Sequence, residues 1–216
     1  MDNYLKPTAV IDCDAPAIGA KARALTGNLA TPREKAVALF YFVRDGIKFN
    51  PYADGDRLEY NRATAVMERG EGFCYQKAIL LAALARAAGI PARLGFADIR
   101  NHQLSERFRE KMFGNNVLVY HGWAELLIDG RWMRATPAYD LEMCREKGFV
   151  PVEFDGTADA RLSTHTQDGQ IHIEYIREHG HYDDLPWEEI LGARDEMLAG
   201  MGVDVDTFMA KWERSE

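Results

Sequence analysis

The longest apolar run of the chain lies between Gly72 and Gly89. Alanine, leucine and isoleucine fill this run and leave little polar face before Arg86. A helix that is hydrophobic nearly all round is normally buried. We therefore expect a buried helix that begins at Cys74, ends at Gly89 and is followed by a strand over residues 90–96.

Capping signals define a second helix. Thr31 can serve as the N-cap, Pro32 occupies the first helical position, and Glu34 can complete a capping box. This helix is expected to end near Gly46. Periodicity predicts further helices over 15–25, 63–69, 141–147, 187–197 and 205–212, and strands over 47–49, 116–128, 131–136 and 171–175. Residues 52–61 are expected to form a surface loop, and residues 100–115 an excursion between strands.

A two-residue turn, Asp129-Gly130, is expected to join two of these strands into a hairpin. Folding the hairpin about this turn places Trp123 opposite Thr136. Thr136 is then a diagonal neighbour of His121, roughly 7–8 Å away between α carbons. Strand alternation sends one set of side chains to a single face: Val117, Val119, His121, Trp123 and Glu125.

The composition is that of a globular protein with a sizeable core. The chain has 216 residues, of which 47% are hydrophobic and 28% charged. These values exclude a disordered or fibrous chain. We expect a single domain over residues 1–216, with its core at about 30–140 and residues 141–216 as a C-terminal extension of the same domain.

Charge and hydropathy exclude several classes of partner. The net charge of −8 argues against nucleic-acid binding through a basic surface. No run approaches ~18 uncharged apolar residues, and the first residues carry no apolar leader, so we expect no membrane partner and a cytoplasmic location. The sequence does not predict the oligomeric state.

The cysteines and histidines do not predict a metal site. Three cysteines, at positions 13, 74 and 144, form no CxxC pair, so neither a disulfide scaffold nor a four-cysteine zinc site is supported. Three histidines lie in an acidic stretch over residues 171–184, but their spacing matches no ligand pattern: His172, His179 and His181. We expect a solvated loop there, and no metal or other cofactor.

Cys74 lies at the first turn of the buried helix, directly after a glycine-containing loop. The unpaired N–H groups and partial positive charge of a helix N-terminus lower the pKa of a thiol, and they can hold an oxyanion. Cys74 is therefore a candidate nucleophile. The alternative is a small buried core cysteine, the commonest fate of a cytoplasmic thiol.

His121, on the predicted strand, is a candidate general base. A cysteine at a helix start that faces a histidine on a sheet is the nucleophile–base arrangement of thiol catalysis. A single histidine on a strand is more often structural, so this interpretation depends on the two side chains meeting.

Four sequence blocks resemble, in the same order, the signature of the transglutaminase-like superfamily. They are Gly72-Phe73-Cys74 before the apolar helix, Ala88-Gly89-Ile90-Pro91-Ala92-Arg93, Tyr120-His121-Gly122-Trp123-Ala124-Glu125, and Gly130-Arg131-Trp132. The similarity covers about residues 30–140. It implies an α+β fold of the papain-like, transglutaminase-core type, with a buried N-terminal catalytic helix packed on an antiparallel sheet. It also implies that Cys74 is the nucleophile and His121 the general base, in acyl transfer from an amide through a thioester to an amine or to water.

The chain departs from the family pattern at the third catalytic position. Where the family commonly has Asp before Pro, this chain has Thr136-Pro137. Threonine cannot supply the anion that stabilises an imidazolium, although its hydroxyl could accept a hydrogen bond from the ring N–H. We rank Thr136 first as the residue that orients His121, Asp140 second and Glu125 third. Asp140 is equally well explained as a solvated cap of the helix that begins at residue 141.

Two further side chains are candidate substrate contacts. Trp123 could form a wall of the cleft, although aromatic residues on one face of a sheet are more often core. Gln76, in the first turn of the catalytic helix, could donate a hydrogen bond to an oxyanion or could simply form the polar edge of the helix.

Together these residues favour thiol-dependent acyl transfer or hydrolysis, acting on a peptide or small amide substrate. Hydrolysis is the more economical choice, because a water-accessible site gives it by default, whereas cross-linking needs a tunnel for an amine. The alternative is a catalytically impaired binding module that kept the fold. The zinc-stapled deglycosylating relatives of this fold are disfavoured, because their paired CxxC motifs are absent.

Overall fold

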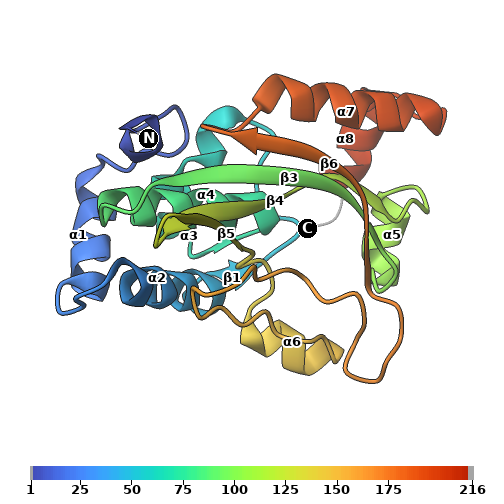
Figure 1. Ribbon diagram of the computed structural model, residues 1–216. Coiled ribbons are helices and arrows are strands. Elements are labelled where there is room, and N and C mark those ends of the chain that lie inside the picture. Colours follow the sequence, from blue (N-terminus) through green and yellow to red (C-terminus); the bar gives the residue numbers. More distant parts are fainter. Residues whose placement is uncertain (1, 214–216) are drawn as a thin grey trace.

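The computed structural model describes residues 2–213, in which helices pack on an antiparallel sheet (Figure 1). The sheet has four strands in the order β5-β4-β3-β6. Their bounds are β3 (Ala92–Asn101), β4 (Val117–Ile128), β5 (Arg131–Ala135) and β6 (Ile173–Tyr182). The predicted α+β class with an antiparallel sheet is confirmed.

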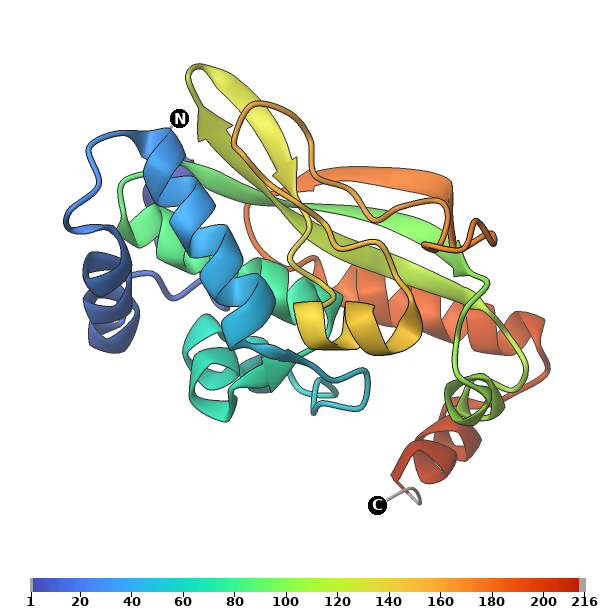
Figure 2. The same ribbon diagram turned by 90° about the horizontal axis from the view of Figure 1, so that it is seen from below.

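Four helices form a layer against this sheet: α1 (Pro16–Thr26), α2 (Pro32–Gly46), α3 (Ala63–Arg69) and α4 (Cys74–Ala87). The central one is α4, which contacts the other three helices as well as β3 and β4. Figure 2 shows α2 crossing in front of α4. Every residue of α4 from Gln76 to Arg86 is buried, which confirms the predicted buried helix. Full burial of leucines such as Leu80 and Leu84 contributes about 2 kcal/mol each.

Helix α2 begins and ends on specific side-chain contacts. The Thr31 hydroxyl accepts from the Glu34 N–H, and the Glu34 carboxylate accepts from the Thr31 N–H, so the predicted capping box is confirmed. At the other end, the fully buried Lys77 of α4 donates to the carbonyls of Arg44 and Ile47. Burial lowers the pKa of this lysine to about 7. These contacts fix α2 to the first turn of α4, where the nucleophile candidate lies.

Two segments that were expected to be irregular contain helical turns. Residues 52–61 include the 3-10 helix η2 (Leu58–Asn61), in which the Asn61 side chain is fully buried. Residues 100–115 include α5 (Glu106–Lys111), which is capped by Ser105. The other short elements are η1 (Asp2–Leu5), β1 (Lys48–Phe49), β2 (Glu71–Gly72), which pairs in parallel with β1, and α6 (Leu141–Lys147).

Within the acidic, histidine-containing stretch, the strand predicted over residues 171–175 is confirmed from Ile173 onward, whereas the solvated loop predicted for the stretch is wrong for most of its length. Strand β6 runs from Ile173 to Tyr182 and pairs along β3. His172, just before the strand, is 1% exposed and stacks on the ring of Phe149. The many charged residues of β6 are tolerated because it is the edge strand of the sheet.

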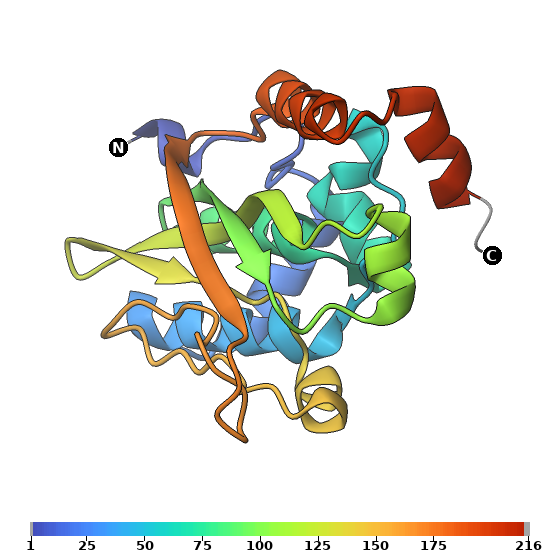
Figure 3. The same ribbon diagram turned by 90° about the vertical axis from the view of Figure 1, so that its right-hand side faces the viewer.

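The C-terminal helices α7 (Trp187–Gly200) and α8 (Val205–Glu213) lie across the molecule from α2 and α6 (Figures 1 and 3). Figure 3 shows α5 and α8 at the same end of the molecule. A second, smaller hydrophobic cluster joins these helices, and its buried members are Phe108, Met112, Leu198 and Phe208. The chain after residue 186 therefore covers the sheet end from which β4 begins.

Strand β4 contains a β-bulge that the simple alternation did not predict. Asp98 on β3 lies opposite two residues of β4, because the pairing shifts between Ala97↔His121 and Ile99↔Leu118. Tyr120, in the bulge, has φ of 52°, and its N–H donates to the Asp98 carboxylate. The prediction that Val117 and Val119 continue the face of His121 is therefore wrong.

Beyond the bulge the predicted hairpin register is confirmed. Asp129-Gly130 forms the turn, and Glu125 pairs with Arg134 and Ala124 with Ala135. This register places Thr136, the next residue after β5, opposite Trp123 and diagonal to His121.

Candidate active site

Cys74 begins helix α4, two residues after the end of β2, the short strand that pairs with β1. The first-turn N–H groups of an α-helix have no intrahelical acceptor and point toward this end. Burial raises the pKa of the Cys74 thiol, while the backbone N–H groups of Gly122, Tyr75 and Cys74 itself act in the opposite direction. The sulfur therefore lies among backbone donors, but burial keeps it protonated at neutral pH.

Gly122 lets the start of α4 approach strand β4 closely. A Cβ atom at this position would lie 2.5 Å from Tyr75 Cβ and 3.1 Å from Tyr75 Cα, so no rotamer change could relieve the contact. The absence of a side chain thus brings the Gly122 N–H to the Cys74 sulfur. His121 is the preceding residue of the strand, and it lines the same cleft as Cys74.

His121 lines the same cleft as Cys74, and its side chain is 3% exposed. Burial, followed by the nearby positive charge of Arg134, lowers the pKa of His121 to about 3. Its Nε2 atom is buried and makes no hydrogen bond to any described residue. The imidazole is therefore neutral at physiological pH, and its other nitrogen, Nδ1, is the one left for the cleft.

Thr136, ranked first as the orienting residue, is fully buried. Its Oγ1, like His121 Nε2, has no hydrogen-bond partner among residues 2–213. These two unpaired polar atoms belong to diagonal residues on one face of the hairpin. Their placement is compatible with the prediction that Thr136 orients His121.

The two carboxylates ranked after Thr136 are engaged elsewhere. Asp140 caps α6 by accepting from the Met143 N–H at 2.8 Å, and it also accepts from the Phe49 N–H at 2.7 Å. Asp140 is thus a helix cap, as the alternative interpretation had it, but it is buried and not solvated. Glu125 accepts from Trp123 Nε1 and Arg93 Nε and pairs with a third partner, His181 Nδ1, at 3.0 Å.

Gln76 is fully buried and all of its amide atoms are used in holding the approach to Cys74. Its Oε1 accepts from the Phe73 N–H, and its Nε2 donates to the Asp54 carbonyl and to Asn61 Oδ1. The side chain therefore anchors the loop over residues 54–61 to the first turn of α4. This arrangement favours a structural role over the predicted oxyanion contact.

Trp123 lies behind His121 rather than in the cleft. Its side chain is 1% exposed, and a Cβ at Gly95 would lie 2.4 Å from its ring nitrogen, so the indole is packed flat on β3. The guanidinium of Arg134 covers the indole at 3.6 Å from the ring centre. The predicted substrate contact by Trp123 is not supported by this burial.

The sequence did not single out Arg134, although it gave the correct register for this residue. Its side chain is 5% exposed, and one terminal nitrogen pairs with Glu178 at 2.8 Å. The Nε and Nη1 atoms are buried and unpaired within the described chain. The sequence signal that could have identified Arg134 is its position two residues before Thr136, because strand alternation places a cationic side chain there on the face of Thr136.

The cleft has a volume of about 820 Å³, which is the size of a typical small-molecule or short-peptide site. Cys74 and His121 lie in its wall, and it extends between α5, α7 and α8. Much of this wall is aromatic or thioether: Tyr52, Phe108, Met197, Phe208, Met209 and Trp212. Its charged lining carries more positive than negative groups: Arg57, Arg107, Lys111 and Arg194 against Asp54 and Asp56.

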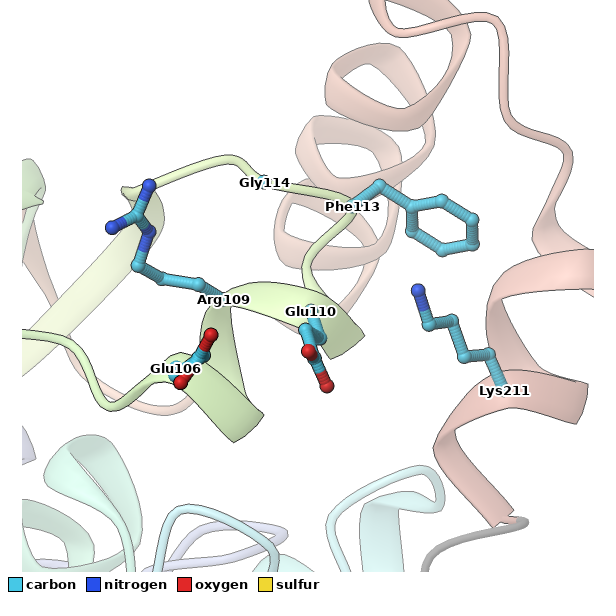
Figure 4. Close-up of a pocket in the computed structure, with 6 residues that line it drawn as sticks. All are labelled: Glu106, Arg109, Glu110, Phe113, Gly114 and Lys211. Atoms are coloured by element: carbon cyan, nitrogen blue, oxygen red, sulfur yellow. The ribbon is translucent and has the colours of Figure 1, made fainter.

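A second hollow of about 480 Å³ lies on the other side of α5 (Figure 4). Figure 4 shows the Lys211 ammonium beside the ring of Phe113, and the two groups are 4.2 Å apart. Glu106, Arg109 and Glu110 form the rest of its lining together with Gly114. None of these six residues is a nucleophile of the kind that thiol chemistry requires.

The cysteines, histidines and acids of the described chain form no group of three that could hold a metal ion. Cys13, Cys74 and Cys144 are all free thiols. Among residues 2–213, no helix has the length and apolar character needed to cross a membrane.

Comparison with solved structures finds distant likenesses. One is a provisionally assigned cysteine protease from Cytophaga hutchinsonii (16% identity, TM-score 0.49), for which the match covers 82% of this chain and 53% of that one. Another is the periplasmic domain of TgpA from Pseudomonas aeruginosa (21% identity, TM-score 0.43), with 62% and 45% covered. This chain thus spans about half the length of each.

A comparison with curated proteins found no match. The model of the transglutaminase-like superfamily matches residues 19–137, which is more than half of the chain and includes both Cys74 and His121. The chain belongs to the transglutaminase-like superfamily.

Proposed function

We propose that the protein is a thiol-dependent enzyme that transfers or hydrolyses the acyl group of an amide. The observation that carries this proposal is the position of the Cys74 sulfur. It lies at the N-terminus of α4, beside the N–H of Gly122, and opens into the same cleft as His121.

The proposed reaction begins when the Cys74 sulfur attacks the amide carbonyl and forms a carbon–sulfur bond. The thiol proton passes to His121, and the carbonyl electron pair moves onto oxygen as an oxyanion, for which the Cys74 N–H is the proposed donor. Collapse of this intermediate breaks the carbon–nitrogen bond, and His121 returns the proton to the leaving amine. Water or an acceptor amine, deprotonated by His121, then attacks the thioester and releases the thiol.

The resting pair is a neutral thiol and a neutral imidazole. Burial raises the pKa of Cys74 and lowers the pKa of His121 to about 3, which is the opposite of what a stable thiolate–imidazolium pair requires. Proton transfer must therefore accompany attack on the carbonyl. Backbone N–H groups stabilise the oxyanion that forms on a bound amide. The proton transfer is therefore favourable only while substrate fills the cleft.

The walls of the cleft favour a substrate with apolar side chains and a negative charge. Aromatic and methionine side chains accept apolar groups of varied shape. The excess of arginine and lysine in the lining stands out in a chain whose net charge is −8. We therefore propose acidic peptides or amides that carry a large apolar residue as the substrate class.

Alkylation by iodoacetamide tests the pairing of Cys74 with His121. Cys74 is half-buried, whereas Cys13 and Cys144 are only 8% and 0% exposed, so exposure alone predicts that Cys74 reacts first. The informative comparison is therefore His121→Ala against the parent, with the modified cysteine located by mass spectrometry. We expect the alkylation rate of Cys74 to fall at least tenfold in His121→Ala, because the general base is lost.

Acyl transfer is tested with an activated ester such as p-nitrophenyl acetate. The expected result is a burst of nitrophenolate and an acetyl group on Cys74 that hydroxylamine removes, as a thioester requires. Cys144→Ser serves as the matched control and should keep the burst, whereas Cys74→Ser should lose it. A burst that survives in Cys74→Ser, or alkylation of Cys74 that is independent of His121, would contradict the proposal.

The second candidate is a non-catalytic binding module. It is favoured by one observation, namely that His121 has a cation, Arg134, as its charged neighbour where the family commonly places an aspartate. This candidate predicts that peptides bind in the cleft but that neither the burst nor the dependence on His121 is found.

A further inference from the structure

A cluster of unpaired polar atoms lies buried beside His121. Seven buried side-chain atoms of the described chain make no hydrogen bond, and two of them belong to His172. The other five gather on one face of the sheet: His121 Nε2, Arg134 Nε and Nη1, Thr136 Oγ1 and Tyr175 Oη. Unpaired buried atoms cost about 1–3 kcal/mol each, so a buried cluster of this size is one that a bound water or ion would stabilise.

The residues that carry these atoms are neighbours in space. The Arg134 Cζ lies 5.9 Å from the centre of the Tyr175 ring, and that ring lies 6.4 Å from the imidazole of His121. Thr136 follows Arg134 by two residues and shares its face. Tyr175 reaches this point from β6, across the strand β3 that separates it from β4.

The chemistry of the cluster is that of a hydrogen-bond donor set. Arg134 can only donate, and the hydroxyls of Thr136 and Tyr175 can each donate one proton. The Tyr175 hydroxyl lies near Arg134 and the Leu162 N–H, which lower its pKa against the effect of burial, but it makes no well-aligned hydrogen bond with either. Donors grouped around a buried guanidinium with two unpaired nitrogens favour an anion over a neutral molecule.

The nearby carboxylates are already bonded to other groups. Glu178 pairs with Arg134 through Nη2 alone and is also 3.6 Å from Arg161. Asp159 accepts from the backbone N–H of Arg134 and pairs with Arg161. Glu125 is held by the three partners described above. The chain therefore offers no further carboxylate, within the part described, to the Nε and Nη1 atoms.

We propose that Arg134, Thr136 and Tyr175 bind a small monovalent anion, such as chloride, beside Nε2 of His121. The anion occupies the position at which the family pattern has an aspartate carboxylate, because Thr136 stands in that sequence position and bears one of the unpaired atoms. It accepts from Arg134 and from the two hydroxyls, and it orients His121 by accepting from the Nε2 proton. This leaves Nδ1 to face Cys74. The binding of the anion stands independently of the proposed function, whereas its effect on Cys74 rests on it.

The test compares sodium chloride with sodium gluconate at equal ionic strength, since gluconate is too large to enter a buried site. An anion that binds only the folded chain multiplies the folding equilibrium constant by a factor of one plus the ratio of the anion concentration to its dissociation constant. We expect a saturable rise of about tenfold when chloride reaches ten times its dissociation constant. Broadening of the ³⁵Cl resonance by the protein, and a chloride-dependent shift of His121 Nε2 in ¹⁵N spectra, report binding directly.

The variant Tyr175→Phe gives a result whose sign distinguishes an anion ligand from an unpaired hydroxyl. In gluconate it should be at least as stable as the parent, because a buried unpaired group is removed. In chloride it should be less stable than the parent and should show little chloride dependence. Tyr41→Phe is the matched control: this hydroxyl bonds to Glu153 in a different part of the molecule, so its loss should leave the chloride effect intact.

A second variant, Thr136→Asp, supplies the negative charge within the chain. We expect its stability and the ¹⁵N shift of His121 to become independent of chloride. The proposal is overturned if the parent shows no saturable difference between the two salts, which would indicate bound water only. It is also overturned if Tyr175→Phe or Thr136→Asp retains the full chloride effect. If chloride binds as described but does not change the alkylation rate of Cys74, the site stands and its catalytic role is refuted.

Discussion

Acidification from pH 7 to pH 5 should destabilise the folded chain, because the folded chain holds two histidines in their neutral form. Burial lowers the pKa of His121 to about 3 and that of His172 to about 4. In the unfolded chain a histidine has a pKa near 6.5. Below this value the unfolded state binds protons that the folded state does not bind. The contribution is therefore fully present above pH 6.5 and is lost as the pH falls toward the folded pKa.

The magnitude follows from the same values. Each such histidine lowers the free energy of unfolding by about 1.4 kcal/mol per pH unit below 6.5. At pH 5 the loss is about 2 kcal/mol for His121 and about the same for His172, together about 4 kcal/mol. A domain of ordinary stability, 5–15 kcal/mol, would lose a large part of its margin. Carboxylates contribute little over this range, because their ordinary pKa values lie below it.

The assay is urea unfolding at pH 7, 6 and 5 in sodium gluconate, which keeps a small bound anion from offsetting the effect. We expect His121→Gln to lose about half of the pH dependence, whatever it does to the stability at pH 7. His165→Gln, at an exposed position, is the control for removing a histidine as such. A pH dependence equal to the parent's in His121→Gln would refute the neutral imidazole, and with it the neutral thiol–imidazole pair.

Three further predictions concern the surroundings of this pair. Gly122→Ala places a methyl group 2.5 Å from Tyr75 Cβ on the facing helix, so we expect urea unfolding to show that the free energy of unfolding falls by about 1–3 kcal/mol. Alkylation of Cys74 should also slow. Arg134→Gln removes the cation that lowers the pKa of His121, and an NMR titration should show that pKa rising. Arg57→Glu, at the rim of the cleft, should weaken binding of an acidic leucine–phenylalanine peptide about three- to tenfold, as measured by calorimetry, whereas Lys147→Glu on α6 should not. Equal effects of the last two substitutions would remove the argument for an acidic substrate.

The parts of the fold that the sequence predicts are those with local signals. The capping box at Thr31 and Glu34 requires only four consecutive residues, and the structure has it. The turn at Asp129-Gly130 sets the register of its hairpin, because a two-residue turn leaves one alignment of the strands. The same register placed Thr136 correctly with respect to His121.

The parts that were not predicted depend on residues distant in sequence. The bulge in β4 exists because the Asp98 carboxylate, on β3, accepts from the Tyr120 N–H and also from His179 Nε2 at 2.7 Å. The ring of His179 stacks on Tyr120 at 4.0 Å. Strand periodicity contains none of this, so alternation failed at Val119. Helix α5 was missed for a similar reason, since its apolar Phe108 packs against Trp212 of α8.

The chain's divergence from the family pattern is therefore a change of charge as well as of one residue. Thr136, where the family pattern has an aspartate, carries no negative charge beside His121, and the buried Arg134 places a positive charge on the same face. Both changes disfavour an imidazolium, and neither alters the approach of α4 to β4 that Gly122 permits. A chain that had merely lost activity would gain nothing from burying a guanidinium whose Nε and Nη1 atoms make no hydrogen bond within the described chain. The two changes are physically compatible with each other, and with a working general base, if a small anion completes the site.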